Sequence, residues 1–443
     1  MNCNSIWKNT IKLKKFKNLD SDKVVDILII GGGITGVSTL YHLKDSNKKI
    51  MLVEQNKIGM STTANSTGKL TYLQNDLLDK IRENFDDKIA LKYIKSQIDT
   101  INEEINIIKK NKIDCDLEKT NSYLYTNNDC EIEKLKDLEM FLNENKIKIY
   151  HKSIDIVDSK YMFCVKNTYT IHPIKFVYGL TKNMDDLIYE NTSIKKIEFN
   201  DKYYMCYTDK YKIKTKYVVV ASHYPYFNIP FLFPLKGYLE KSYLSASKYN
   251  LDKLSLISYN KPVISIRNYK NYILYLSNSD SINKNTKDLN NYKELLKKIN
   301  DLKLKPNYLW SNSDIITNDS LPYVGEIKKR MYIATGYNTW GLTNGFLAGS
   351  IISSLILRKK NKYKKLFDPD RISTQNIKTI SNITKNIDGY IKGISSSHKC
   401  PHMGCGLIYN ETEHTWDCPC HGSRFNELGK VIKSPANKDI DVK

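Results

Sequence analysis

Cysteine and histidine residues recur at close spacing in one stretch near the end of the sequence. Two pairs each combine a thiol with an imidazole, Cys400-x-His402 and Cys418-x-x-His421. One further cysteine follows within each group, Cys405 and Cys420. Thiolates and neutral imidazoles brought together by two loops are the ligands that soft and borderline transition metals prefer. The stretch therefore predicts a metal site.

Three interpretations of this stretch are open: an iron–sulfur cluster, a structural zinc, and a degenerate site without metal. Zinc fingers place their cysteine pair and histidine pair in separate halves, whereas each half here holds one of each. The pattern resembles the Rieske signature, in which two cysteines bind one iron and two histidines bind the other. The resemblance implies a [2Fe–2S] cluster on Cys400, His402, Cys418 and His421. It also implies a disulfide between Cys405 and the cysteine that precedes His421, Cys420.

A second motif lies near the start of the chain. The apolar stretch 24–30 predicts a buried strand, and it leads directly into Gly31-x-Gly33-x-x-Gly36 and a helix over 37–44. A second strand over 49–53 then ends at Glu54. This order of strand, glycine-rich turn, helix, strand and acidic residue is typical of dinucleotide binding. The glycines permit a tight turn and a close approach to a pyrophosphate, and Glu54 is placed to accept from the ribose hydroxyls.

The remaining chain alternates helical and strand patterns. Isoleucines that recur every three or four residues predict a long amphipathic helix over 86–110, and another helix is expected over 129–145. A buried strand is expected over 217–221. A second glycine-rich turn at 335–343 joins a strand to a helix that ends near 357, and it is another possible anion or ring site.

Taken together, the motifs resemble a flavoprotein of the D-amino-acid oxidase/glycine oxidase superfamily with a C-terminal Rieske domain. The resemblance rests on segments 26–36, 59–71, 321–325 and 334–345 and on the two cysteine–histidine groups. It implies FAD as a cofactor beside the cluster. By this likeness the FAD-binding residues are Gly31, Gly33, Gly36, Glu54, Ser61, Thr62, Thr63, Lys69, Ile194, Gly336, Trp340, Gly341 and Thr343.

The expected fold class is α/β. It comprises a Rossmann-like FAD-binding domain, an inserted α+β substrate domain and a small all-β cluster module. We expect the FAD-binding domain over 1–85, 150–221 and 311–360, and the substrate domain over 86–149 and 222–310. A polar linker is expected over 361–389 and the cluster module over 390–443. The module is short for a Rieske domain, so we expect it to depend on the flavin domain for support.

Composition sets limits on partners and location. The formal net charge is +21, and only six of the 69 basic residues are Arg. Because the lysines are spread along the chain and not gathered in one block, we expect no nucleic-acid partner. No signal peptide and no stretch long enough to span a membrane is visible, so we expect a cytoplasmic protein without a transmembrane segment.

Three functions are compatible with the pattern. The first is oxidation of an amine or amino acid by hydride transfer to FAD, with electrons passing through the cluster to an unknown acceptor protein. The second is a reductase that receives electrons from a donor protein through the cluster. The third is a non-enzymatic flavin and iron–sulfur redox sensor. No catalytic base stands out. Arg267 is a weak candidate for a clamp on a substrate carboxylate, and a surface or structural role for it is favoured.

Overall fold

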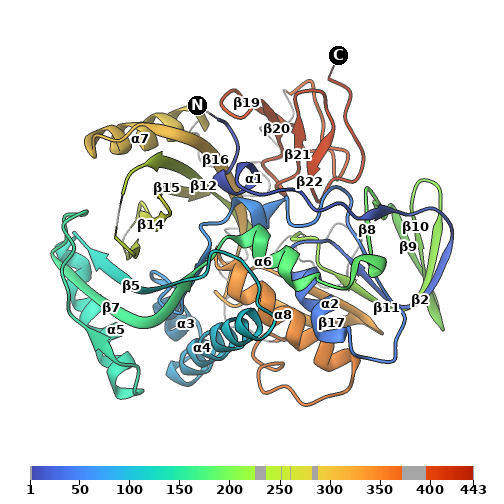
Figure 1. Cartoon of the computed structure of the whole chain (residues 1–443), viewed down its shortest axis with the longest axis horizontal. Coiled ribbons are helices and arrows are strands. Elements are labelled where there is room, and N and C mark those ends of the chain that lie inside the picture. Colours follow the sequence, from blue (N-terminus) through green and yellow to red (C-terminus); the bar gives the residue numbers. More distant parts are fainter. Residues whose placement is uncertain are drawn as a thin grey trace.

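The computed structural model describes residues 2–224, 236–250, 252–259, 261–281, 288–371 and 396–442. Within these residues the chain forms three sheets, two large and one small (Figure 1). The small sheet lies at the C-terminal end and packs against the edge of one large sheet.

The first large sheet has a parallel centre, as expected for a nucleotide-binding fold. Its nine described strands are β1 (Lys17–Asn18), β8 (Ile188–Glu190), β3 (Ile50–Val53), β2 (Lys23–Ile30), β11 (Lys212–Val220), β10 (Tyr203–Tyr207), β9 (Lys196–Asn200), β18 (Met331–Thr335) and β17 (Tyr323–Lys328). Strands β3, β2, β11 and β18 run parallel to one another, and both faces of their centre are buried. Continuous apolar strands such as β3 are stable only when helices or other chain segments cover both faces.

Helices α2 (Ile34–Leu43) and α8 (Gly341–Ile356) cover this sheet and pack closely on each other. Small residues make this possible. A Cβ atom added at Gly36 lies 1.9 Å from the Gly31 carbonyl oxygen, and one added at Gly349 lies 2.4 Å from Ser38 Oγ and 2.6 Å from the Thr39 amide nitrogen. The third glycine of the N-terminal motif thus packs the helix against its own turn, as the motif predicts.

The second large sheet is mostly antiparallel. Its described strands are β16 (Pro306–Thr317), β12 (Gly237–Lys248), β15 (Tyr272–Ser281), β14 (Ser265–Tyr269), β13 (Ser255–Ser258), β5 (Glu118–Thr126), β7 (Tyr161–Thr170), β4 (Lys69–Leu70) and β6 (Ile149–Tyr150). β13 and β5 are the parallel pair that joins its two halves. Aromatic and aliphatic side chains of the sheet form a core under helix α7 (Asp288–Asp301).

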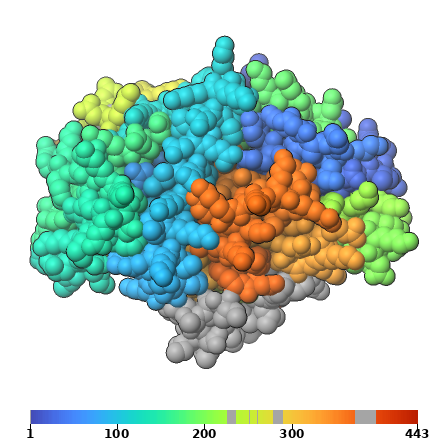
Figure 2. Space-filling model, turned by 90° about the horizontal axis from the view of Figure 1, so that it is seen from below, coloured from blue at the N-terminus to red at the C-terminus, as the bar shows by residue number. Residues whose placement is uncertain are grey.

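The other helices support these sheets. They are α1 (Ile6–Asn9), α3 (Leu77–Asn84), α4 (Asp87–Lys110), α5 (Ile132–Glu144) and α6 (Pro173–Leu180), with 3-10 turns η1 (Thr62–Asn65), η2 (Asp129–Glu131) and η3 (Asp185–Leu187). α4 packs on α3 and α8. Figure 2 shows α4 in light blue beside the orange segment that contains α8, on the face of the molecule away from the small sheet.

The third sheet forms the cluster module. Its strands β19 (Ile408–Asn410), β20 (Thr415–Asp417), β21 (Arg424–Asn426) and β22 (Val431–Lys433) form an antiparallel meander. The cysteines and a few apolar side chains, including Phe425, make up its small core. Figure 1 shows the module in red beside β16 and β12.

The α/β fold with an all-β C-terminal module is confirmed, as are the long helix at 87–110 and the strand–turn–helix order at 23–43. Sheet membership crosses the expected segment boundaries, because β7 and most of β16 belong to the second sheet. The boundaries therefore stay a prediction. The part of the expected linker after 371, and the first six residues of the expected module, 390–395, lie outside the described residues.

The close contact of α2 with α8 predicts the effect of one added methyl group. Gly349→Ala places its Cβ against Ser38 and the α2 backbone, so the helices must separate, at a cost of roughly 1–3 kcal/mol. We expect a lower thermal unfolding midpoint by circular dichroism. Ser350→Ala, at the next and more exposed position, is the control and should leave the midpoint unchanged; equal midpoints for the two variants would contradict the packing argument.

Candidate functional site

A deep cleft lies between the two large sheets, and most of the expected FAD residues line it. It encloses about 1560 Å³ of empty space, including its open mouth. Its walls come from the N-terminal turn, the 59–67 loop, the 337–342 turn and one face of the second sheet.

The N-terminal turn forms one end of the cleft. Gly31 has φ +111°, and a Cβ atom added there lies 2.6 Å from the Ala221 carbonyl oxygen. Glu54 lies at the end of β3, where its carboxylate accepts from the Gly32 amide at 2.7 Å and the Asn56 amide at 2.9 Å. Burial raises the pKa of Glu54, while these amides oppose the rise. The Glu54 carboxylate therefore links the glycine-rich turn to the segment that follows β3.

Two loops distant in sequence meet at the middle of the cleft. The Thr63 Oγ1 atom accepts from the first helical amide of α2, that of Ile34, at 3.1 Å. The Thr35 hydroxyl lies 2.7 Å from the Tyr337 hydroxyl of the second glycine-rich turn. Both turns are thus joined at the N-terminus of α2, where free amides favour an anion such as a pyrophosphate.

Unpartnered polar atoms mark the cleft as a binding site. In the described part of the chain, the cleft-lining atoms that are buried without a hydrogen-bond partner are Thr62 Oγ1, Asn65 Oδ1, Ser66 Oγ, Ser193 Oγ, His223 Nε2, Asn312 Oδ1 and Trp340 Nε1. Buried polar groups nearly always have partners. A long polar ligand with apolar rings satisfies much of such a wall, so these residues fit FAD with room for a smaller polar ligand beside it.

The structure brings most of the predicted FAD residues together. Those that line the cleft are Gly31, Gly33, Glu54, Ser61, Thr62, Thr63, Ile194, Trp340 and Gly341. The other four, Gly36, Lys69, Gly336 and Thr343, are not among its described lining residues. Lys69 is buried behind the wall, where its ammonium donates to the Ser265 hydroxyl at 2.6 Å and to the Leu256 carbonyl at 2.7 Å.

Arg267 also lies behind the wall. It is 1% exposed, and its guanidinium donates to the backbone carbonyls of Thr67 at 3.0 Å, Gly68 at 2.9 Å and Ile171 at 3.2 Å. Burial lowers its pKa to about 10. These contacts favour a structural role, in which Arg267 holds the 59–68 loop in place. Its role as a substrate clamp remains a prediction without a supporting contact.

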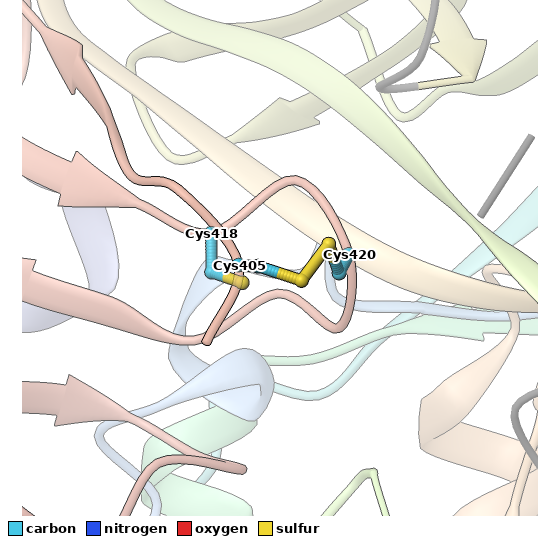
Figure 3. A group of neighbouring side chains, drawn as sticks. All are labelled: Cys405, Cys418 and Cys420. Atoms are coloured by element: carbon cyan, nitrogen blue, oxygen red, sulfur yellow. A yellow bond between two sulfur atoms is a disulfide. The ribbon is translucent and has the colours of Figure 1, made fainter. Parts of the chain in front are cut away.

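The cysteine–histidine loops lie at one end of the module. Cys405 and Cys420 form a disulfide that joins the loops, and Figure 3 shows Cys418 beside it. The sulfur atoms of these three residues lie within 4.8 Å of one another. Because disulfide sulfurs are not thiolates, the free thiols left to bind metal are those of Cys418 and Cys400. Hydrogen bonding from Cys418 lowers the pKa of Cys400 to about 7 despite its burial.

The two imidazoles of the motif lie close to each other. The His402 and His421 ring centroids are 4.9 Å apart. Burial lowers the pKa of His402 to about 4 and that of His421 to about 3, so both rings are neutral at physiological pH, as metal ligation requires. Within the described chain, Nδ1 of each ring is buried without a hydrogen-bond partner. Two free thiols and two unpartnered imidazole nitrogens fit a Rieske cluster.

The strand pair β12–β16 separates the cleft from the module. Glu240, Ser242 and Leu244 line the cleft, and residues between them face the other way. Lys241 binds Asp417 of the module at 2.6 Å, and Tyr243 packs on Tyr292 of α7. Successive side chains of a strand point to opposite faces. A single layer of strand therefore lies between the two sites.

A second connection runs through residues 222–224. Ser222 and His223 line the cleft, while the next ring, Tyr224, lies 4.9 Å from that of His421. Ser434 of the module also lines the cleft, and its hydroxyl donates to the Ser222 carbonyl at 2.9 Å. The cleft and the cysteine–histidine loops thus share a wall.

Buried ion pairs hold the module in this position. Arg424 binds Asp417 at 2.8 Å and Glu413 at 3.1 Å, and Glu413 also accepts from Tyr292 of α7 at 2.8 Å. Burial by itself raises the pKa of Asp417, but Arg424 and Lys241 hold it well below the usual range. Such buried charges are stable only when every member is paired, so the network requires the docked position.

These two sites on this fold define a flavoprotein oxidoreductase that carries an iron–sulfur module. Comparison with known families agrees. The chain belongs to the FAD dependent oxidoreductase (DAO) family, whose model matches residues 26–355, and a Rieske [2Fe-2S] domain model matches residues 373–442. The protein is therefore an oxidoreductase whose cofactors are FAD and a [2Fe–2S] cluster.

Relatives share one or both parts. A "Putative Rieske 2Fe-2S iron-sulfur protein YhfW" of Bacillus subtilis is 26% identical, over 98% of this chain and 96% of that protein. Cytochrome b6-f complex iron-sulfur subunit 2 of Trichormus variabilis is 34% identical over 60 residues, which are 14% of this chain and 34% of that protein.

Solved structures share the fold. L-proline dehydrogenase from P. horikoshii has a TM-score of 0.64 and 16% identity, covering 79% of this chain and 98% of that one. Glycine oxidase from Bacillus cereus has a TM-score of 0.60 and 17% identity, covering 79% and 99%. No helix in the described residues is long and apolar enough to cross a membrane.

The structural role of Arg267 can be tested by a conservative change. Lysine has neither the planar guanidinium that lies over Trp7 nor the Nε donor that bonds the Asn268 carbonyl at 2.8 Å. We expect Arg267→Lys to lose about 2–3 kcal/mol of stabilisation of the 59–68 loop, and to lower the temperature of FAD release, followed by flavin fluorescence. The exposed Arg358→Lys is the control. An unchanged release temperature with lost turnover would instead support a substrate clamp.

The disulfide can be tested in the same way. A bridge that closes a loop of 15 residues contributes roughly 3 kcal/mol in the chain-entropy model. The double variant Cys405→Ser/Cys420→Ser should therefore hold less cluster and lose its visible absorbance at a lower temperature. Cys130→Ser, at an exposed free thiol, is the control. Equal cluster content and equal bleaching temperature in the two variants would show that the bridge is dispensable.

Proposed function

We propose that the protein oxidises an amine or amino acid in the cleft and sends the electrons out through the module. The observation that carries this proposal is the shared wall: His223 lines the cleft, and Tyr224 packs on His421. A wall one strand thick favours electron exchange between a flavin on one side and a cluster on the other. The fold relatives named for an L-proline dehydrogenase and a glycine oxidase support a C–N bond as the substrate group.

The residues have distinct parts in this proposal. When bound, FAD accepts a hydride equivalent from the substrate, and the cluster accepts one electron at a time. Cys400 and Cys418 hold one iron and His402 and His421 the other. The cleft lining from Leu244 and other apolar side chains excludes water from the reacting bond.

The two electrons removed from the substrate must leave the protein, and an external acceptor protein takes them. The substrate loses two electrons and two protons and leaves as an imine, which water hydrolyses to a carbonyl compound and ammonia or an amine. A one-electron acceptor protein, acting twice, takes the electrons from the module.

We also propose that the domain boundaries expected from the sequence separate the FAD-binding, substrate-binding and cluster-binding parts of the chain.

The proposal predicts an ordered reduction. An amine substrate added to anaerobic holoprotein should bleach the flavin first, and the electron paramagnetic resonance signal of a reduced Rieske cluster should follow. In Cys400→Ser the flavin should still bleach, but no cluster signal should appear. Turnover with a one-electron acceptor should fall by more than an order of magnitude.

Other outcomes decide between the remaining functions. If reduced ferredoxin reduces the cluster and then the flavin, while no amine or amino acid bleaches the flavin, the protein is a reductase with inward electron flow. If wild-type protein and Cys400→Ser turn over equally fast with the one-electron acceptor, the cluster is not the outlet.

A further inference from the structure

Two carboxylates face each other in the wall of the cleft. Glu240 of β12 and Asp314 of β16 are direct partners in the antiparallel register, and both line the cleft. Directly opposed residues of such a pair have Cβ atoms about 4.5–5.5 Å apart. Like charges at this separation destabilise a sheet unless a positive charge lies between them.

Both carboxylates are withdrawn from water. Glu240 is 7% exposed and Asp314 is 9% exposed. Burial raises the pKa of Asp314 to about 6, although Lys433 opposes the rise and Glu240 adds to it. A buried carboxyl group such as that of Asp314 is costly to keep ionised beside a second carboxylate in a free cleft. A bound cation removes that cost.

An unsatisfied acceptor lies beside the pair. Asn312, two residues before Asp314 on β16, is 7% exposed and also lines the cleft. Its amide nitrogen donates to Asp314 Oδ2 at 2.9 Å, while its Oδ1 atom has no partner among the described residues. This free acceptor lies next to the carboxylate pair on the same side of the ladder, opposite Ser242 of β12, and suits a ligand that brings N–H donors.

Two lysines act on the carboxylate pair, but neither is among the residues that line the cleft. Lys261 approaches Glu240 at 3.5 Å, but it is 52% exposed. Lys433 donates to the Ser313 carbonyl at 2.8 Å, and Ser313 belongs to the opposite face of β16. Lys57, at the other end of the cleft, binds Glu190 at 2.7 Å. The described lining of the cleft contains no arginine that could pair with a substrate carboxylate.

We propose that the substrate is a cationic amine without an α-carboxylate, which binds as an ammonium between Glu240 and Asp314 and gives one N–H proton to this carboxylate pair before hydride leaves its α-carbon. This inference rests on the proposed amine oxidation and narrows its substrate class. Leu244, Ile257, Val263 and Leu276 line the same cleft, so they provide an apolar wall for the alkyl or aryl part of the amine. Amino acids are disfavoured, because their carboxylate meets two acidic side chains and no arginine.

A matched pair of compounds tests the proposal. Butylamine and norvaline differ by the α-carboxylate alone. We expect butylamine, and not norvaline, to bleach the flavin of anaerobic holoprotein, and butylamine to bind competitively with tetramethylammonium, followed by the change in flavin absorption. Glu240→Gln and Asp314→Asn should each raise the half-saturating concentration of both cations at least tenfold, about 1.4 kcal/mol. Glu133→Gln, an exposed carboxylate on α5, is the control.

The outcomes separate this inference from the proposed function. If norvaline reduces the flavin as well as butylamine does, or if neither variant changes cation binding, the cation site is wrong while amine oxidation stands. If no amine or amino acid reduces the flavin, the proposed reaction fails. In that case tetramethylammonium binding that is lost in Glu240→Gln still supports the carboxylate pair as a cation site, and binding unaffected by the variants rejects it.

Discussion

The two-residue alternation of a β-strand is the constraint on which this molecule depends. In β12 and β16, side chains of one parity face the flavin cleft and those of the other parity face the module and α7. Lys241 can bind Asp417 only because its neighbours Glu240 and Ser242 point the opposite way. A shift of register by one residue would bury the cleft carboxylates against the module and turn Lys241 of β12 toward the cleft. One strand pair therefore fixes both sites at once.

The sequence was most informative where local chemistry demands a particular residue. The turn glycines, the alternation of strand and helix at 23–53 and the cysteine–histidine spacing predicted the two cofactors and the fold class, because each depends on contacts within a short segment. The strands β12 and β16 were not foreseen. Serine and other polar residues interrupt the apolar residues of both strands, and both of their faces are buried against protein, so neither apolar alternation nor a continuous apolar run marks them. Glu240, Asp314 and Tyr224 were missed for the same reason: tertiary contacts alone give them a role.

The cluster module is too small to be stabilised by its own apolar core. Its four strands are short, and its apolar core is little more than the cysteines, Leu407, Phe425 and Ala436. Polar contacts with the rest of the chain add to its stability. Glu413 accepts a hydrogen bond from Tyr292, and Asp417 forms an ion pair with Lys241. The shortness of the segment was apparent from the sequence. The partners that compensate for it were not, because they lie more than a hundred residues away in the chain.

Tyr224 gives the two sides of the cysteine–histidine site different surroundings. His421 is 3% exposed beneath the Tyr224 ring. The loop that carries His402 is more open, because Pro401 and Gly404 are exposed and Met403 is 51% exposed. The flavin domain therefore covers the site from the His421 side, and a protein partner has access to it from the side of Met403.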